Sequence, residues 1–299
     1  MDNKIKNLNE QQTGILYAIS AFLFWGLIPI YFKQVASVDP FEVLIHRIIW
    51  SVVVLVFLLY FTKQFHHVKK ILLNFTQLKY LLLSSFFVSF NWLVFIYAVS
   101  NNQILETSLG YFINPLVSIL MGYLFFNETM NTKQKIAIFI VVVAISIQVI
   151  SFGSLPIISL TLAFSFALYG MVRKKVNIAS IPGLFVETLL LLPIALFYLG
   201  YLINTNHSAT LAGDSYITYM LLLAGIITVL PLLWFNAAVT RLQLSTVGIL
   251  QYIGPSVAFL VAIFIYDEAF TTEKVVTFSL IWFALCIFSY DAIYKKKKQ

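Results

Sequence analysis

The sequence is poor in charged residues and in cysteine. Only 10% of its 299 residues are Asp, Glu, Lys or Arg, whereas soluble domains carry about 25%. A single cysteine, Cys286, excludes an intramolecular disulfide, and we expect it to be a small packing residue. The shortage of charge excludes an ordinary water-soluble domain and favours a chain that lies in a lipid bilayer.

Several motifs of catalysis are also missing. The sequence contains no phosphate-binding loop ending in Gly-Lys-Ser/Thr, no His-Glu-x-x-His and no Gly-x-Ser-x-Gly. Only four histidines occur, and three of them, His66, His67 and His207, lie in predicted loops. We therefore expect no ATP hydrolysis, no metal, no cofactor and no enzymatic activity. A membrane-embedded enzyme acting on a lipid or small metabolite remains the alternative.

Long apolar runs make up most of the chain, of which 61% is hydrophobic. A helix that crosses a bilayer needs about 20 apolar residues. The aromatic residues fit lipid-facing and interfacial positions. The sequence therefore predicts an all-α polytopic membrane protein with ten transmembrane helices. These lie near residues 14–33, 40–61, 79–99, 104–126, 133–152, 155–172, 182–203, 215–237, 246–266 and 274–294.

The basic residues predict the orientation of these helices. With a cytoplasmic N-terminus, sixteen Lys and Arg residues lie in inner loops and tails, two (Lys33 and Lys274) lie outside, and Arg47 lies within a span. This asymmetry follows the positive-inside rule and puts both termini in the cytoplasm. It also explains the net charge of +7 without a nucleic-acid partner. The run Lys295 to Lys298 is interpreted as an orientation anchor, with binding of anionic lipid as the alternative.

An internal repeat relates the two halves of the chain. Residues 93–132 align without a gap onto residues 233–272, with identities that include Pro115/Pro255 and Glu128/Glu268. The offset of 140 residues spans five predicted helices, and because five is odd, the second copy must enter the membrane from the opposite side. We therefore predict two inverted five-helix repeats, residues 1–152 and 153–299.

Proline interrupts the fourth and ninth predicted helices at equivalent places. Pro115 and Pro255 lack an N–H and leave the carbonyls of Tyr111 and Gln251 without their helical donor. In lipid such a group needs another partner, so these helix breaks are predicted to face protein or a wet cavity. A tolerated kink is the alternative.

Charged residues inside predicted helices are candidates for function. Arg47, beside His46, lies about 10 Å from the outer end of its span, where a lone Arg facing lipid would cost several kcal/mol. Glu106 is its preferred partner, as a structural clamp or as part of a substrate contact, and Glu42 is also available. Glu187 is offset from Arg47 by 140 residues. We expect these groups to act in gating or coupling, with a proton site or a buried protonated side chain as alternatives for Glu187.

Polar and aromatic residues recur in the corresponding helices of both halves. The amides Asn91, Asn114 and Asn236 cost energy in an apolar helix unless they face a path or another helix. The aromatic residues are candidate ligand contacts, with packing or an interfacial belt as the alternative. Glu128 and Glu268 are interpreted as loop or helix-cap groups. The predicted cavity residues are Trp25, Tyr31, Asn91, Trp92, Tyr97, Tyr111, Asn114, Tyr169, Trp234, Asn236, Gln251 and Tyr252.

Several motifs resemble the RarD branch of the EamA-type drug/metabolite transporter superfamily. They are residues 25–33 (Trp-Gly-Leu-Ile-Pro-Ile-Tyr-Phe-Lys), 46–51 (His-Arg-Ile-Ile-Trp-Ser), 91–92 (Asn-Trp) and 106–115 (Glu-Thr-Ser-Leu-Gly-Tyr-Phe-Ile-Asn-Pro). The resemblance covers essentially the whole chain. It implies a permease of the bacterial inner membrane with a central cavity lined by the first, third, fourth, sixth, eighth and ninth helices.

The resulting hypothesis is a secondary transporter with alternating access to one central site. Its substrate would be a small amphipathic metabolite or drug, such as an amino acid or a chloramphenicol-like compound, a class that the resemblance implies. Proton coupling is an expectation by analogy with the family, and a monomer and a homodimer both remain open. A passive channel fits less well, because channels usually use oligomeric rings of charge or carbonyls.

Overall fold

The computed structural model of the chain describes residues 9–100, 104–153, 156–211, 214–266 and 272–296, and this part is helical without β-strands. Its elements are α1 (Glu10–Gln34), α2 (Pro40–Phe61), α3 (Phe65–Leu73), α4 (Phe75–Ser100), α5 (Ile104–Phe126), α6 (Thr132–Phe152), α7 (Ile157–Val176), α8 (Ser180–Asn204), the short 3₁₀ helix η2 (Ala209–Leu211), α9 (Ser215–Val239), α10 (Leu244–Gln251), α11 (Ile253–Tyr266) and α12 (Thr272–Lys296).

Most of these helices have the length and composition of membrane spans. Among the described residues, nine helical segments are long and apolar enough to cross a bilayer, with α10 and α11 together forming one of them. In α12 the apolar stretch that was assessed, Val275–Ile287, is shorter. Large apolar side chains lie on the outer surface, and Phe75 and Phe197 are 80% and 82% exposed. Such a large exposed apolar surface would be unfavourable in water. The chain is therefore a multi-pass α-helical membrane protein.

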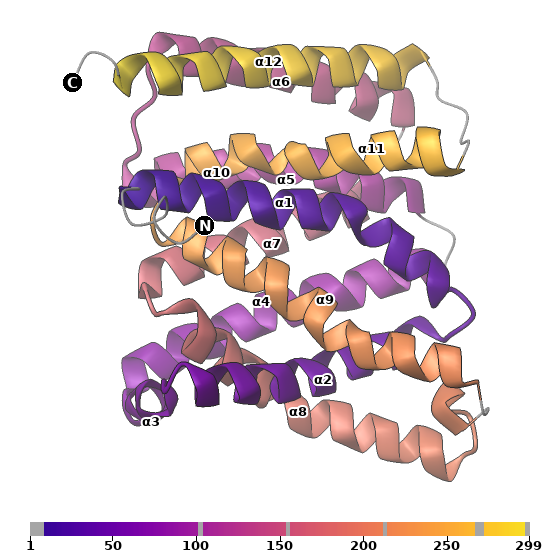
Figure 1. Ribbon diagram of the computed structural model, residues 1–299. Helices are drawn as coiled ribbons and strands as arrows, with labels where there is room; N and C mark the ends of the chain where they lie inside the picture. Colours follow the sequence, from indigo (N-terminus) through magenta and orange to yellow (C-terminus); the bar gives the residue numbers. More distant parts are fainter. Residues whose placement is uncertain (1–8, 101–103, 154–155, 212–213, 267–271, 297–299) are drawn as a thin grey trace.

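The helices run side by side in one bundle, and α6 and α12 pair along one edge of it (Figure 1). Next to them lie α1, α5, α10 and α11, while α2 and α8 pair at the opposite edge. In the middle, α9 packs on α1 and α2, and α7 packs on α4 and α5. The first residues of α1 and the last described residues of α12 lie at the same end of the bundle, on the left in Figure 1.

Side-chain caps explain why several helices begin before or at the start of their apolar runs. Asn9 and Asn131 each form a capping box, the first with Gln12 at the start of α1 and the second with Gln134 at the start of α6. Asp39 and Asp214 accept hydrogen bonds from the first backbone N–H groups of α2 and α9. These caps satisfy N–H groups that apolar surroundings would otherwise leave unpaired.

Two close helix contacts depend on glycine. A Cβ added at Gly26 of α1 would lie 2.5 Å from the Cβ of Val257 in α11. At Gly225 of α9, an added Cβ would collide with the backbone of Trp50 in α2. Glycine at these positions lets the helix backbones approach closely, which is how helices gain van der Waals contact inside a membrane.

The two predicted proline interruptions differ in the structure. The second is present, because α10 ends at Gln251 and α11 begins at Ile253, with Pro255 in its first turn. The first was predicted wrongly as a break, since α5 continues through Pro115 as one helix. In the turn before Pro115, the carbonyl of Phe112 accepts a hydrogen bond from the Tyr252 hydroxyl at 3.0 Å. A donor from the α10–α11 junction thus contacts α5 at the residue next to Tyr111, whose carbonyl loses its helical donor at Pro115.

A short amphipathic helix, α3, replaces part of the predicted loop 62–78. Val68 and Ile71 are buried, whereas Lys69 and Lys70 are exposed. α3 packs on α4 and α8. Nine residues are too few to cross a membrane, so α3 is a helix at one end of the bundle, seen at the lower left of Figure 1.

Candidate functional site

Arg47 projects from α2 into the interior of the bundle. Its Nε donates a hydrogen bond to the Thr228 hydroxyl of α9 at 3.0 Å. The guanidinium carbon lies 4.9 Å from the ring centre of Trp92 in α4 and 5.7 Å from that of Phe32 in α1. Thr228 and Trp92 are buried, so Arg47 faces protein and not lipid, as the sequence predicts.

Two tyrosines lie close enough to Arg47 to interact with its charge, Tyr31 of α1 and Tyr111 of α5. The Tyr31 hydroxyl donates to the carbonyl of Met220 at 2.9 Å. Tyr111 contacts the ring of Phe95, with 6.4 Å between ring centres, and its side chain is 55% exposed. Predicted cavity residues from α1, α4 and α5 thus gather around one cation.

The preferred partner of Arg47, Glu106, has a side chain that lies outside the described residues, so that pairing stays a prediction. Among the carboxylates that the structure does describe, none forms an ion pair with Arg47. Tyr97, another predicted cavity residue, is exposed on α4.

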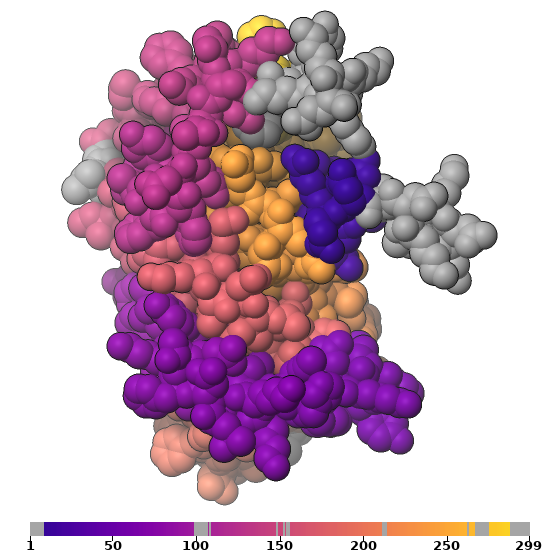
Figure 2. Space-filling view, turned by 90° about the vertical axis from the view of Figure 1, so that its left-hand side faces the viewer, coloured from indigo at the N-terminus to yellow at the C-terminus, as the bar shows by residue number. Residues whose placement is uncertain are grey.

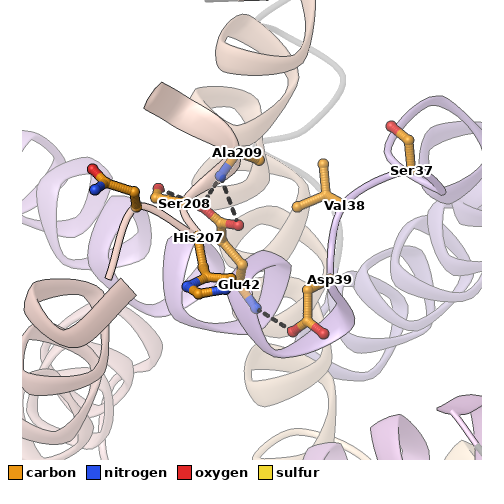
Figure 3. A pocket seen from close by; sticks show the side chains of 8 residues that line it. Ser37, Val38, Asp39, Glu42, His207, Ser208 and Ala209 are labelled. Atoms are coloured by element: carbon orange, nitrogen blue, oxygen red, sulfur yellow. Dashed lines mark hydrogen bonds between the residues drawn. The ribbon is translucent and has the colours of Figure 1, made fainter. Parts of the chain in front are cut away.

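Glu42, the other carboxylate considered for Arg47, binds the connection between α8 and η2. It accepts hydrogen bonds from the Ala209 N–H at 2.9 and 3.0 Å and from the Ser208 hydroxyl at 2.6 Å (Figure 3). It also lies 3.9 Å from His46 on the next turn of α2. Glu42, Ser208 and Ala209 border a cavity of about 500 Å³ between the α1–α2 and α8–η2 connections. His46 is buried beside Glu42 and Trp50, whose Nε1 donates to it at 3.3 Å.

A second arginine, Arg173, is buried with Glu187 between α7 and α8. Arg173 Nη1 lies 3.6 Å from Glu187 Oε1, and both side chains are inaccessible. Ser84 of α4 donates to Glu187, and the Tyr169 hydroxyl lies 3.4 Å from its other oxygen. The amide of Asn236 in α9 donates to that hydroxyl at 2.9 Å. Four helices therefore meet at one buried polar network.

The role of Arg173 is not predicted from the sequence. Arg173, with Lys174 and Lys175, is one of the sixteen cations expected in inner loops and tails, whereas the structure places it inside the last turns of α7. A charged residue next to two lysines looks like a topology signal. Its spacing of four residues from Tyr169, which puts both on one face of a helix, is the signal that could have identified it.

The predicted amide residues bind other helices. Asn114 Oδ1 accepts from Gln251 Nε2 at 3.0 Å, and Asn114 Nδ2 donates to the carbonyl of Ala163. Asn91 donates to the carbonyl of Leu162 and to the Ser165 hydroxyl, both at 2.9 Å. Asn114, Gln251, Tyr252, Tyr169 and Asn236 are all buried. In this conformation they hold helices together, and their role in binding substrate stays a prediction.

Trp25 and Trp234, the other two predicted tryptophans, have different neighbours from Trp92. Trp25 contacts the rings of Phe166 and Phe235, with 5.6 and 5.7 Å between ring centres. Trp234 borders a cavity of about 560 Å³ between α1, α9 and the α7–α8 connection, together with Tyr17 and Arg241. Figure 2 looks onto this end of the molecule, where α9 and α10 (orange) are visible beside α1 (indigo).

Glu128 connects the two halves at the same end. Its carboxylate accepts from the backbone N–H groups of Leu244 and Ser245 at 2.7 and 2.9 Å, which confirms its predicted role as a helix cap. The capped helix is α10, in the other half of the chain. Lys174 lies 3.8 Å from Glu128 and also donates to the carbonyl of Leu242. The equivalent Glu268 lies outside the described residues.

Among the described residues, His, Cys, Asp and Glu form no group of three or more that could hold a metal ion. Arg47, with Trp92 and Phe32 beside it, can recognise negative charge together with apolar or aromatic groups, whereas the charge of Arg173 is already compensated by Glu187.

Comparison with known proteins agrees with this arrangement. Residues 12–150 match the model of the EamA-like transporter family. The chain is 45% identical to "Protein RarD" of Salmonella typhi, over 97% of this chain and 99% of that protein. It is 41% identical to "Uncharacterized transporter YojE" of Bacillus subtilis, over 96% and 97%. A third relative, "Chloramphenicol-sensitive protein RarD" of Pseudomonas aeruginosa, is 28% identical over 96% of each chain.

A solved crystal structure has the same fold, with a TM-score of 0.71 and 13% identity over 93% of this chain and 97% of the other. A bundle of apolar helices with buried charges and a near-complete alignment to transporters leads to one conclusion: the chain belongs to the EamA-like transporter family and is a RarD-like permease.

Proposed function

We propose that the protein is a secondary transporter of the bacterial inner membrane that moves a small amphipathic metabolite or drug by alternating access. Its ten transmembrane helices would form two inverted repeats, residues 1–152 and 153–299, with both termini in the cytoplasm. The bacterial relatives and their names support transport across a membrane. The name of the Pseudomonas relative supports a drug-like substrate such as chloramphenicol.

One contact supports the inverted repeat most directly. The hydrogen bond from Tyr252 to the carbonyl of Phe112 joins residues that are 140 positions apart, which is the offset of the sequence repeat. If a twofold axis in the membrane plane relates two repeats, residues on that axis meet their own counterparts. Phe112 and Tyr252 fulfil this condition.

The remaining helix contacts support the same relation. The proposed repeat makes α1 equivalent to α7, α4 to α9, and α5 to the α10–α11 segment. The pair α1–α9 then corresponds to α7–α4, and the pair α5–α7 corresponds to α11–α1. All four pairs are in contact. The helices α2 and α8 are equivalent and contact each other, and the same holds for α6 and α12. A shared pocket at the interface of the repeats follows from this arrangement in known transporter folds.

The two arginine clusters supply a mechanism for gating. Arg47 and Glu187 occupy equivalent positions of the repeats, and we assign them to opposite gates. In this conformation the Arg173–Glu187 pair joins α7 and α8, while Arg47 is bonded to α9 through Thr228. Alternating access would break one set of contacts while the other forms. Glu187 is also the candidate for proton coupling.

Counterflow in proteoliposomes tests this function. Vesicles loaded with unlabelled amino acids or chloramphenicol are diluted into the labelled compound. A carrier accumulates the label by exchange, a membrane enzyme converts it, and a channel shows no stimulation by the trans compound. Absence of exchange across a metabolite panel, together with chemical conversion of any panel member, would replace the transporter with the enzyme.

A further inference from the structure

Arg47 and Arg173 differ in their access to other molecules. All three guanidinium nitrogens of Arg173 are buried without a hydrogen bond, and Glu187 supplies the compensating charge. Arg47 has its Nε bound to Thr228, while its two terminal nitrogens are not among the buried unpaired atoms and have no hydrogen bond to any described residue. Arg47 therefore has accessible donors that the described part of the protein does not use.

No described carboxylate compensates the charge of Arg47. Glu42 is the carboxylate on the same helix, and it is bound to Ser208 and Ala209. A cation that faces the interior of a membrane protein is costly without a counter-charge. Rings supply part of the compensation, since Trp92 and Phe32 lie within cation–π distance. A full negative charge is still missing among the described residues.

The surroundings of Arg47 offer apolar surface together with one further donor. Phe32, Trp92 and Phe95 present rings beside the cation or beside Tyr111. The Tyr111 hydroxyl has no hydrogen bond to a described residue, and its side chain is partly accessible. Tyr31, in contrast, is occupied by the carbonyl of Met220. A ligand that met this set would need an anionic group for Arg47 and an apolar body for the rings.

We propose that Arg47 is the anion-recognising residue of the substrate site, and that the substrate class is organic acids with an apolar or aromatic body. The carboxylate would accept hydrogen bonds from the terminal nitrogens of Arg47, in the bidentate geometry that guanidinium groups favour. Trp92 and Tyr111 would contact the body. This inference rests on the proposed transport function, names its substrate class, and gives Arg47 a substrate contact in addition to the gate assigned to it above.

The test uses three small probes with purified full-length protein. 3-Phenylpropionate has the charge and the ring, 3-phenylpropionamide has the ring without the charge, and acetate has the charge without the ring. Binding is measured as the rise in melting temperature, because a ligand that binds only the folded protein stabilises it by mass action. We expect stabilisation by 3-phenylpropionate at roughly tenfold or more lower concentration than by either other probe, as a charge-assisted hydrogen bond implies.

Variants test whether the preference for 3-phenylpropionate arises at Arg47. Arg47→Gln should abolish the preference for 3-phenylpropionate over its amide, while the ligand-free melting temperature stays equal or rises, because an uncompensated cation has been removed. Arg47→Lys should retain part of the preference, since it keeps the charge and loses the planar fork. Thr228→Val, which removes the acceptor for Nε, should weaken the preference less than Arg47→Gln. Lys69→Gln, an exposed cation on α3, is the matched control and should behave as the wild type.

Several outcomes would overturn the proposal. Equal stabilisation of the wild type by the acid and the amide, or by the acid and acetate, would do so, as would no stabilisation by the acid. An unchanged preference in Arg47→Gln combined with a lower ligand-free melting temperature would make Arg47 a structural clamp. Counterflow of a neutral substrate that is insensitive to Arg47→Gln would refute this inference while leaving the transport function intact.

Discussion

At the scale of single residues, the Arg173–Glu187 pair is the most deeply buried charge contact among the described residues. Both side chains are removed from solvent, so each depends on the other for compensation. Removing one partner of a buried pair leaves an unpaired charge, and this costs about 3–5 kcal/mol in water-soluble proteins. An exposed pair is worth only about 0–1 kcal/mol.

We therefore predict that Arg173→Gln lowers the thermal stability of the purified protein strongly. The matched control is Arg241→Gln, which removes an ion pair of 2.8 Å with Glu10, a side chain that is 82% exposed. The control should shift the melting temperature little. The double variant Arg173→Gln with Glu187→Gln should recover part of the loss. A small effect of Arg173→Gln alone would mean that water or lipid headgroups reach Glu187.

Much of the residue-level interpretation was accessible from the sequence, and some of it was not. Arg47 was recognised as an interior cation because it interrupts an apolar run. Arg173 was not, because a charge at the end of a run looks the same whether it faces water or another helix. The partners of Asn91 and Asn114 lie 71 and 49 positions away. Helical periodicity carries no information about which helices meet.

At the scale of helices, close packing of α7 against α8 depends on Gly183. A Cβ added there would lie 3.0 Å from Cζ of Arg173 and closer still to its Nη1. The neighbouring guanidinium is fully buried, so it has little room to move. Overpacking at such a site typically costs about 1–3 kcal/mol.

Gly183→Ala is thus expected to destabilise the protein, and Gly200→Ala in the same helix provides the comparison. An added Cβ at Gly200 meets nothing within 4 Å, and alanine is a better helix former than glycine by about 1 kcal/mol. Melting temperatures measured in one detergent should move in opposite directions, down for Gly183→Ala and unchanged or up for Gly200→Ala. Equal shifts would show that the α7–α8 contact is loose.

Helix positions were predicted well where the apolar run defines both ends. The predicted ranges 40–61 and 104–126 coincide with α2 and α5. α1 begins earlier than the predicted residue 14, at Glu10, because the capping box of Asn9 continues the helix into polar sequence. α3 was missed because its apolar stripe is short and one-sided. The contact of Tyr252, at the junction of α10 and α11, with the turn before Pro115 joins residues 140 positions apart, so local sequence does not reveal it.

At the scale of the whole molecule, the proposed inverted repeat makes a prediction about the two sides of the membrane. Lys133 at the start of α6 and Glu273 at the start of α12 are equivalent at an offset of 140 residues. Inversion requires that they lie on opposite sides, with Lys133 in the cytoplasm by the positive-inside rule.

Cysteine labelling checks this directly. In a Cys286→Ser background, which removes the only native thiol, a membrane-impermeant maleimide applied to intact cells should label Glu273→Cys and spare Lys133→Cys. His207→Cys, in the exposed α8–η2 connection, should be labelled, and Lys69→Cys should be spared. Permeabilised cells should label all four variants. Labelling of Lys133→Cys and Glu273→Cys from the same side would refute the inversion.

The pairing of α6 with α12 has a consequence for the order of assembly. α12 packs mainly on α6, yet about 120 residues separate the end of α6 from the start of α12. At a synthesis rate of about 5–20 residues per second, α6 waits roughly 6 to 24 seconds for its partner. During that interval lipid chains must cover the face of α6 that α12 later occupies, so this edge of the bundle forms only after the helices between α6 and α12 have been synthesised.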